Sequence, residues 1–337
     1  MKIQEFDYKY VPLSEPVPIK DQVWRDGVLP LVTTRTMTYM HENYIRDCIE
    51  GILMQKTTFP VRVTIHDDAS TDKTAVIIKE YESKYPKIIK AVYQSKNTYS
   101  LTDKNERRKL RKSFFELQVG KYSAMCEGDD YWTDPLKLQK QVSFLEKNID
   151  YVLTFHDCLI IDENGELLQQ SKLNDNHKRD YTREDLILGN LVPTLSVVYR
   201  RKYNKYIPQK PSHVINGDTY LFSNLGRFGK GHYHKDISPA VYRAHCGGIW
   251  SSKSLLEKNT HKLNNCIALL DAHFPENQSL LKQKLFDLSC KRLVLFPCKY
   301  DRFRYYSVVI SRIPFNKLLF KNLLRIHYYL FFKKISS

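Results

Sequence analysis

The feature of this sequence that most constrains its fold is an alternation of short β-branched segments with amphipathic ones. Between the first two β-branched segments, Ile45, Ile49 and Ile52 recur at helical spacing. Strand character is found at 31–36, 61–66, 88–93 and 122–126. This alternation predicts parallel strands joined by right-handed crossovers, and hence an α/β fold with a Rossmann-like, mostly parallel sheet flanked by helices. Ligands bind such sheets beyond the carboxyl ends of the strands.

The rest of the chain gives weaker signals. A long strand is expected over 151–161, a hairpin turn at Asn164-Gly165 and a further strand over 192–200. Beyond about residue 250 the pattern becomes helical. We therefore predict three parts, a polar, proline-containing arm at 1–27, an α/β catalytic domain at 28–250 and a helical region with a basic amphipathic tail at 251–337.

The charge and composition of the chain limit the classes of partner that it is expected to bind. A net charge of +16 favours nucleic acid, acidic lipid or phosphorylated substrates, although a basic surface with no specific partner is an alternative. The sequence carries no RRM, KH or helix-turn-helix signature, so we expect no nucleic-acid partner. The seven cysteines are widely spaced without a C-x-x-C pair, which indicates reduced thiols in a cytoplasmic protein. Neither a signal-peptide core nor a run of about 18 apolar residues is found.

Carboxylates gather directly after two predicted strands. Asp67 and Asp68 follow the second strand, and Glu127, Asp129 and Asp130 follow the fourth. Adjacent acids repel one another, and a hard divalent cation such as Mn²⁺ or Mg²⁺ relieves that repulsion while bridging to substrate phosphates. The alternatives are a helix N-cap at Asp67-Asp68 and an acidic capping turn at 127–130. Two such clusters in one α/β chain favour the metal site.

These motifs resemble family 2 glycosyltransferases of the GT-A fold. The resemblance rests on four segments. The first two are 32–45 and Asp67-Asp68-Ala69-Ser70-Thr71-Asp72, which is similar to D-D-x-S-x-D. The other two are the stretch from Gly120 to Val142, with its E-G-D-D-Y-W element, and a Y-R-x-H-x-G-G-x-W-S segment at 242–251. The last segment is similar to one in bacterial members that build surface polysaccharides. Met37 and Met40 depart from the Pro and Asn usual in the first of these segments.

The resemblance implies roles for particular residues. Thr38, Tyr39, Asp68 and Asp129 are expected at a nucleoside-diphosphate sugar, as is Arg108, for which Arg107 and Arg111 are equal alternatives. The metal would be held by Asp130 as first choice, with Asp129 and Glu127. Tyr39 is alternatively a half-buried turn aromatic, and the arginines a solvated helix face.

Further candidates come from later segments. Asp218 follows a turn and is our candidate for the general base, unless it only caps the helix that it begins. His245 and Trp132 are possible additional site residues, although a lone histidine is more often structural.

The predicted function follows from these assignments. We expect transfer of a sugar from a nucleoside-diphosphate sugar, with UDP-sugars favoured, to the hydroxyl of a glycan or lipid-linked glycan, with inversion, in surface polysaccharide, lipopolysaccharide or capsule assembly. A nucleotidyl- or sugar-phosphate transferase on the same fold is the alternative. Beyond Asp301 the chain has basic but no acidic residues, and its aromatic amphipathic pattern favours a peripheral site on the inner membrane surface over a packed C-terminal helix.

Overall fold

The computed structural model describes residues 8–101, 103–211, 214–248 and 253–272, together with 279, 281–285, 287 and 288. The chain forms two compact units. The first unit comprises Met1–Leu186, Asn190–Ile207 and Leu225–His245, and the second comprises Ile187–Gly189, Pro208–Asn224 and Cys246–Ser337.

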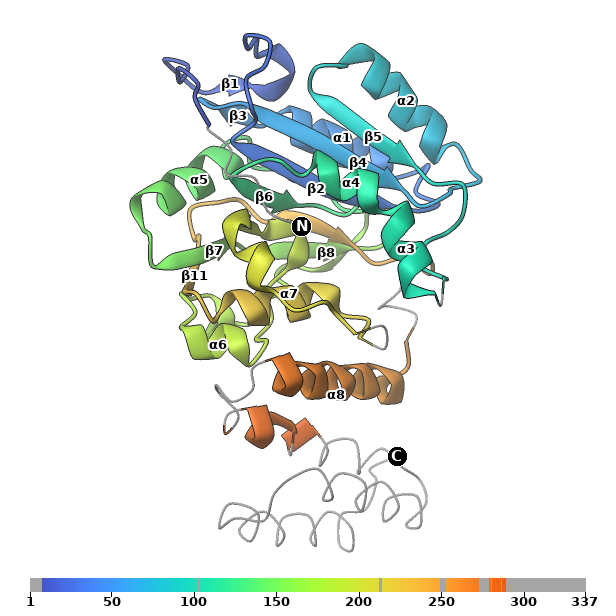
Figure 1. Cartoon of the computed structure of the whole chain (residues 1–337), viewed down its shortest axis with the longest axis vertical. Helices are drawn as coiled ribbons and strands as arrows, with labels where there is room; N and C mark the ends of the chain where they lie inside the picture. The colour runs from blue at the N-terminus through green and yellow to red at the C-terminus, as the bar shows by residue number, and fades with distance from the viewer. Residues whose placement is uncertain are drawn as a thin grey trace, which may run out of the picture. The chain divides into compact units, whose positions relative to one another are not determined.

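A seven-stranded sheet forms the centre of the first unit (Figure 1). In spatial order its strands are β11 (Lys230–Tyr233), β7 (Tyr151–Phe155), β10 (Val198–Arg200), β6 (Tyr122–Met125), β2 (Val32–Thr38), β4 (Val61–Asp67) and β5 (Ile89–Tyr93). The four strands from β6 to β5 run parallel, whereas β10 is antiparallel to both neighbours. The prediction of a mostly parallel α/β sheet is therefore confirmed.

Helices flank this sheet. They are α1 (Ile45–Leu53), α2 (Thr74–Lys84), α3 (Lys104–Leu110), α4 (Lys112–Leu117), α5 (Lys137–Lys147) and α6 (Arg183–Ile187). In Figure 1, α3 and α4 lie on the near side of the sheet and α1 on the far side. The predicted apolar stripe of α1 is buried, with Ile45, Ile49 and Ile52 inaccessible to solvent and joined to the main hydrophobic core.

Two smaller sheets complete the first unit. β1 (Val17–Pro18) pairs antiparallel with β3 (Lys56–Thr57), and the adjoining 3₁₀ turn Ile19–Asp21 buries Ile19 in the core, so this part of the N-terminal arm is anchored. β12 (Ala240–Arg243) runs parallel to β8 (Cys158–Ile161), which pairs antiparallel with β9 (Leu167–Gln169). The hairpin turn predicted at Asn164-Gly165 joins β8 to β9, and Gly165 has a φ of 91°, in the region that favours glycine.

Two predicted strands differ from the structure. The single strand expected over 151–161 is interrupted at His156 and Asp157, so β7 and β8 belong to different sheets. The cause is the buried carboxylate of Asp157, whose Oδ1 accepts from the N–H groups of Cys158 and Leu173 and turns the chain. The strand expected over 192–200 is confined to β10, because a 3₁₀ turn at Thr194–Ser196 follows Pro193.

The second unit contains most of α7 (Gly217–Leu225) and all of α8 (Leu255–Ala272). Leu263, Cys266 and Leu269 form the buried stripe of α8. The remaining 3₁₀ turns, Asp175–His177 and Arg201–Tyr206, belong to the first unit. Across the residues that the structure describes, no helix is both long and apolar enough to cross a membrane.

Candidate active site

The candidate site begins where the turns after two neighbouring parallel strands meet. β2 and β6 are hydrogen-bonded neighbours, so the loop after β2 and the acidic turn after β6 lie at the same edge of the sheet. The N–H of Gly128 donates to the carbonyl of Met37 at 2.9 Å. A Cβ at position 128 would lie 2.6 Å from Thr38 Cβ, so only glycine allows this approach.

The loop between β2 and α1 is tied to the loop between β4 and α2. Three successive N–H groups of the first loop donate to side chains of the second loop or of the first residue of α2. Met40 donates to Ser70 Oγ (2.9 Å), His41 to Thr74 Oγ1 (2.9 Å) and Glu42 to Asp72 Oδ2 (3.1 Å). Met40 has a φ of 58°, which few non-glycine residues adopt, and these bonds hold that turn. The Ser and the last Asp of the D-D-x-S-x-D motif, Ser70 and Asp72, therefore shape the neighbouring loop.

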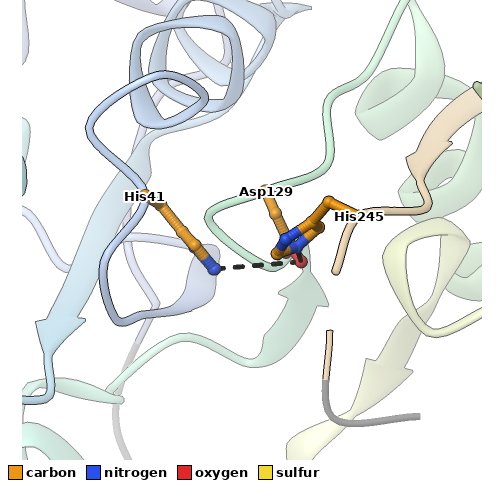
Figure 2. A group of neighbouring side chains, drawn as sticks. All are labelled: His41, Asp129 and His245. Atoms are coloured by element: carbon orange, nitrogen blue, oxygen red, sulfur yellow. Dashed lines mark hydrogen bonds and ion pairs between the residues drawn. The ribbon is translucent and has the colours of Figure 1, made fainter. Parts of the chain in front are cut away.

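This loop brings His41 to the acidic turn. The side chains of His41, Asp129 and His245 converge so that one ligand atom from each lies within 4.8 Å of the others, a geometry able to hold a metal ion (Figure 2). Asp129 Oδ2 lies 3.0 Å from His245 Nε2 and 3.9 Å from His41 Nε2. All three side chains retain some solvent exposure, between 8% and 19%, so an ion can reach them.

The charges in this group favour an ionised carboxylate. Burial would raise the pKa of Asp129, but the hydrogen bond that His245 donates and the nearby His41 outweigh it, and the pKa lies below its usual range. Burial lowers the pKa of His41, although Asp129 opposes the shift. A carboxylate beside a neutral imidazole is a donor set that divalent metals accept.

Asp130 occupies a different environment. Its side chain is buried, and its Oδ1 accepts from the N–H of Arg243 at 3.0 Å. Burial, together with the charges of Asp129 and Glu127, raises the pKa of Asp130 well above its usual range. Among the described residues, the group with metal-binding geometry includes neither Asp130 nor Glu127. Glu127 is half-buried, and its carbonyl accepts from the N–H of Asp130.

Arg243, which is not among the site residues predicted from the sequence, organises the acidic turn. Its Nε donates to the Asp129 carbonyl at 3.2 Å, and the terminal nitrogen donates to Asp47 on α1 at 2.8 Å. The guanidinium lies over the rings of Tyr44 and Tyr131, 4.7 and 5.7 Å from their centroids. Its place in the Y-R-x-H segment was the only signal available in the sequence.

Asp68 is turned toward the segment after β5. The buried carboxylate accepts from the N–H groups of Thr98 (2.9 Å) and Tyr99 (3.0 Å). Of the three arginine alternatives, Arg111 lies against this carboxylate, with a nitrogen 3.9 Å from it, and its Nε donates to Thr98 Oγ1 at 2.7 Å. Arg108 lies on the exposed side of α3.

The remaining candidates fall in three places. Tyr39 is 45% exposed in the loop that carries His41, and Thr38 Oγ1 is 3.2 Å from His41 Nδ1. Trp132 is buried in the core, where its ring N–H donates to the Leu195 carbonyl. Asp218 belongs to the second unit, at the start of α7, where it accepts from the N–H of Thr219. The basic tail lies outside the described residues.

Known proteins with similar sequences or folds identify the family of this chain. The profile described as "Glycosyl transferase family 2" matches residues 36–207. An uncharacterised protein of Mycobacterium tuberculosis is 37% identical over 218 residues, which cover 64% of this chain and 60% of that protein. The chain thus spans about 60% of the length of this curated relative.

Two solved structures share the fold. TarS of S. aureus, residues 1–349 in complex with UDP-GlcNAc, superimposes with a TM-score of 0.62 at 18% identity, covering 88% of this chain and 86% of that one. The mannosyltransferase PcManGT of Pyrobaculum calidifontis, in complex with GDP-Man and Mn²⁺, gives a TM-score of 0.51 at 13% identity, covering 94% and 87%. The profile match extends over half of this sequence, from β2 past β10, and the chain belongs to glycosyl transferase family 2.

Proposed function

We propose that the chain transfers a sugar from a nucleoside-diphosphate sugar to an acceptor hydroxyl. The observation that carries the proposal is the convergence of His41, Asp129 and His245 at the carboxyl edge of the sheet in a family 2 chain. A divalent cation held there would neutralise the charge that develops on the leaving nucleoside diphosphate. A UDP-sugar is the favoured donor, since a TarS structure contains UDP-GlcNAc.

The donor side of the site has distinct parts in this proposal. Tyr39, half-exposed at the loop after β2, borders the nucleobase, and Asp68 with Arg111 forms the polar wall of the base pocket. Asp129 and His245 would hold the cation, which would neutralise negative charge on the diphosphate. Asp130 keeps the acidic turn closed through the Arg243 N–H rather than acting as the primary ligand.

The chemical step proposed is a single displacement with inversion. The acceptor oxygen forms a bond to the anomeric carbon as the bond from that carbon to the diphosphate oxygen breaks, and the hydroxyl proton passes to a carboxylate. We assign that carboxylate to Asp218, within a catalytic domain of residues 28–250. The products are a glycoside and a nucleoside diphosphate.

The proposed class of acceptor rests on the basic and aromatic character of the last segment of the chain. A glycan or lipid-linked glycan of surface polysaccharide, lipopolysaccharide or capsule assembly suits a chain whose last segment is basic and aromatic. Flotation with anionic liposomes, comparing the full chain with one ending at residue 312, tests the membrane contact. Equal flotation of both would remove the tail from the proposal.

The activity itself is tested by a screen and a product analysis. Sugar nucleotides are first ranked by thermal stabilisation of the protein in the presence of Mn²⁺. The best donor is then incubated with candidate acceptors, and the released nucleotide is identified. Release of a nucleoside diphosphate is expected, whereas pyrophosphate or a nucleoside monophosphate would support a nucleotidyl- or sugar-phosphate transferase instead.

A further inference from the structure

The metal-binding group takes its ligands from three separate parts of the chain. His41 follows β2, Asp129 follows β6 and His245 follows β12, and their ligand atoms face one another (Figure 2). Two of the three ligand atoms are imidazole nitrogens. This composition differs from the all-carboxylate site that the acidic motif alone predicts.

We propose that His41 is a third protein ligand of the donor-site cation, and that two imidazoles with one carboxylate make the site select Mn²⁺ and later transition ions over Mg²⁺. The inference rests on the proposed function, because it concerns the cation assigned to the donor diphosphate. The inference adds to the cation site a ligand from the loop between β2 and α1, which also carries Tyr39.

The separations suit ligands of one ion. Neighbouring ligands on an octahedral ion with bonds of about 2.1 Å lie about 3 Å apart. The 3.0 Å between His245 and Asp129 already meets this value, and the 3.9 Å between His41 and Asp129 requires a shift of about 1 Å. The two imidazole rings are nearly perpendicular, with centroids 5.7 Å apart, so they do not stack against each other.

His41 is held in the orientation that ligation needs. Its Nδ1 lies 3.2 Å from Thr38 Oγ1, which leaves Nε2 directed at Asp129. A hydrogen-bonding partner on the other ring nitrogen is the usual support of a ligating histidine. The backbone N–H of His41 is fixed by Thr74 Oγ1, and Gly128 packs against both Thr38 and His41.

The choice of metal follows from the ligand atoms. Mg²⁺ prefers oxygen ligands and gives up its waters reluctantly. Imidazole is a better ligand for transition ions, whose affinities for nitrogen sites rise from Mn²⁺ through Co²⁺ to Ni²⁺. Two nitrogens out of three protein ligands therefore favour the transition ions, with other positions left for donor oxygens and water.

The test measures metal binding by the full chain without nucleotide. Mn²⁺ affinity is read from the free-ion electron paramagnetic resonance signal, Mg²⁺ affinity from competition with Mn²⁺, and nitrogen ligation from the visible absorption of bound Co²⁺. For His41→Ala we expect a loss of about 10- to 100-fold in Mn²⁺ affinity, a much smaller loss for Mg²⁺, and a changed Co²⁺ spectrum. His177→Ala, which removes an imidazole from the 3₁₀ turn Asp175–His177 outside the metal-binding group, is the control and should leave all three unchanged.

The outcomes separate this inference from the proposed function. The role of His41 alone would be overturned by one combination of results. In that case His41→Ala keeps the wild-type Mn²⁺ affinity and Co²⁺ spectrum, whereas Asp129→Ala no longer binds the metal. Unchanged binding in Asp129→Ala as well would overturn the metal site itself. If His41→Ala does not fold, His41→Gln carries the same test, because glutamine lacks the imidazole, and the same loss of preference for Mn²⁺ over Mg²⁺ is expected.

Discussion

The guanidinium of Arg243 donates to the carboxylate of Asp47 at 2.8 Å and so joins β12 to α1. The same side chain donates to the Asp129 carbonyl, and the Arg243 N–H is bound by Asp130. One residue thus fixes the turn that carries the acidic motif. It also precedes His245 by two positions, so it positions both sides of the metal-binding group.

Arg243→Lys tests this positioning role. Lysine keeps the charge but lacks the second donor direction and the flat surface that lies on Tyr44 and Tyr131. We expect a loss of about 1–3 kcal/mol in the free energy of unfolding by urea, and a weaker Mn²⁺ affinity. Arg46→Lys is the control, because Arg46 pairs with Glu80 at 2.7 Å on the exposed surface, where the substitution should have little effect on stability. Equal effects of the two substitutions would argue against the role.

Gly128→Ala tests the close approach of the acidic turn to β2. The added Cβ would lie 2.6 Å from Thr38 Cβ and 3.1 Å from His41 Nδ1. We expect a loss of about 1–3 kcal/mol in stability and a reduced Mn²⁺ affinity, because Thr38 and the Asp129 turn must separate. Gly217→Ala is the control, since among the described residues its Cβ would meet the side chain of Lys210, at an ordinary contact distance of 3.4 Å. Unchanged stability and metal affinity in Gly128→Ala would contradict the geometry.

Lys137 gives the protein a specific dependence of stability on pH. The side chain is fully buried, with its Nζ 2.7 Å from Gln141 Oε1 and 4.1 Å from the centroid of Trp132, and burial lowers its pKa to about 7. The unfolded chain, with an ordinary lysine pKa of about 10.4, binds more protons above pH 7. The contribution of Lys137 to stability therefore rises with pH between about 7 and 10.

Lys137→Met removes this contribution. The difference in unfolding free energy between the variant and the wild type, measured in urea at pH 7, 8 and 9, should shift in favour of the wild type by up to about 1.4 kcal/mol per pH unit. Other titrating groups cancel in this difference. A difference that stays constant over the range would show that Lys137 is charged in the folded protein.

Asp218→Asn separates chemistry from donor binding. The substitution removes the proposed base while keeping the size of the side chain, so transfer should fall by about 10²- to 10⁴-fold. Mn²⁺-dependent binding of UDP, measured by calorimetry, should remain at the wild-type level. Asp129→Ala is the contrasting variant, because it should abolish that binding together with transfer. Full turnover by Asp218→Asn would remove Asp218 from the mechanism.

The four parallel strands β2, β4, β5 and β6 and the helix α1 could be predicted because their signals are local. β2 and β4 are short runs rich in β-branched residues, and the period of Ile45, Ile49 and Ile52 fixes the inner face of α1. The break between β7 and β8 could not be predicted in this way. It depends on hydrogen bonds from Asp157 to Cys158 and to the distant Leu173, which no periodicity records.

The candidate site was predictable only in part for the same reason. Acids after a strand place Asp129 and Asp130 at the correct edge of the sheet. Their different environments depend on His41 and Arg243, which lie 88 and 114 positions from Asp129 along the chain. Apart from the place of each residue in a motif segment, no sequence signal predicts these roles, because the roles depend on contacts that form only in the folded protein.

Three hydrogen bonds couple the evolution of two loops. They join Met40, His41 and Glu42 to Ser70, Thr74 and Asp72. The two segments depend on each other for their backbone conformation, although they are about thirty residues apart in the sequence. A change at Ser70 or Asp72 touches no ligand directly, yet it moves the backbone that presents His41. We therefore expect residues 40–42 and 70–74 to change together among homologues. A chimera that takes only one of the two segments from a relative should have a weakened affinity for the cation while it still folds.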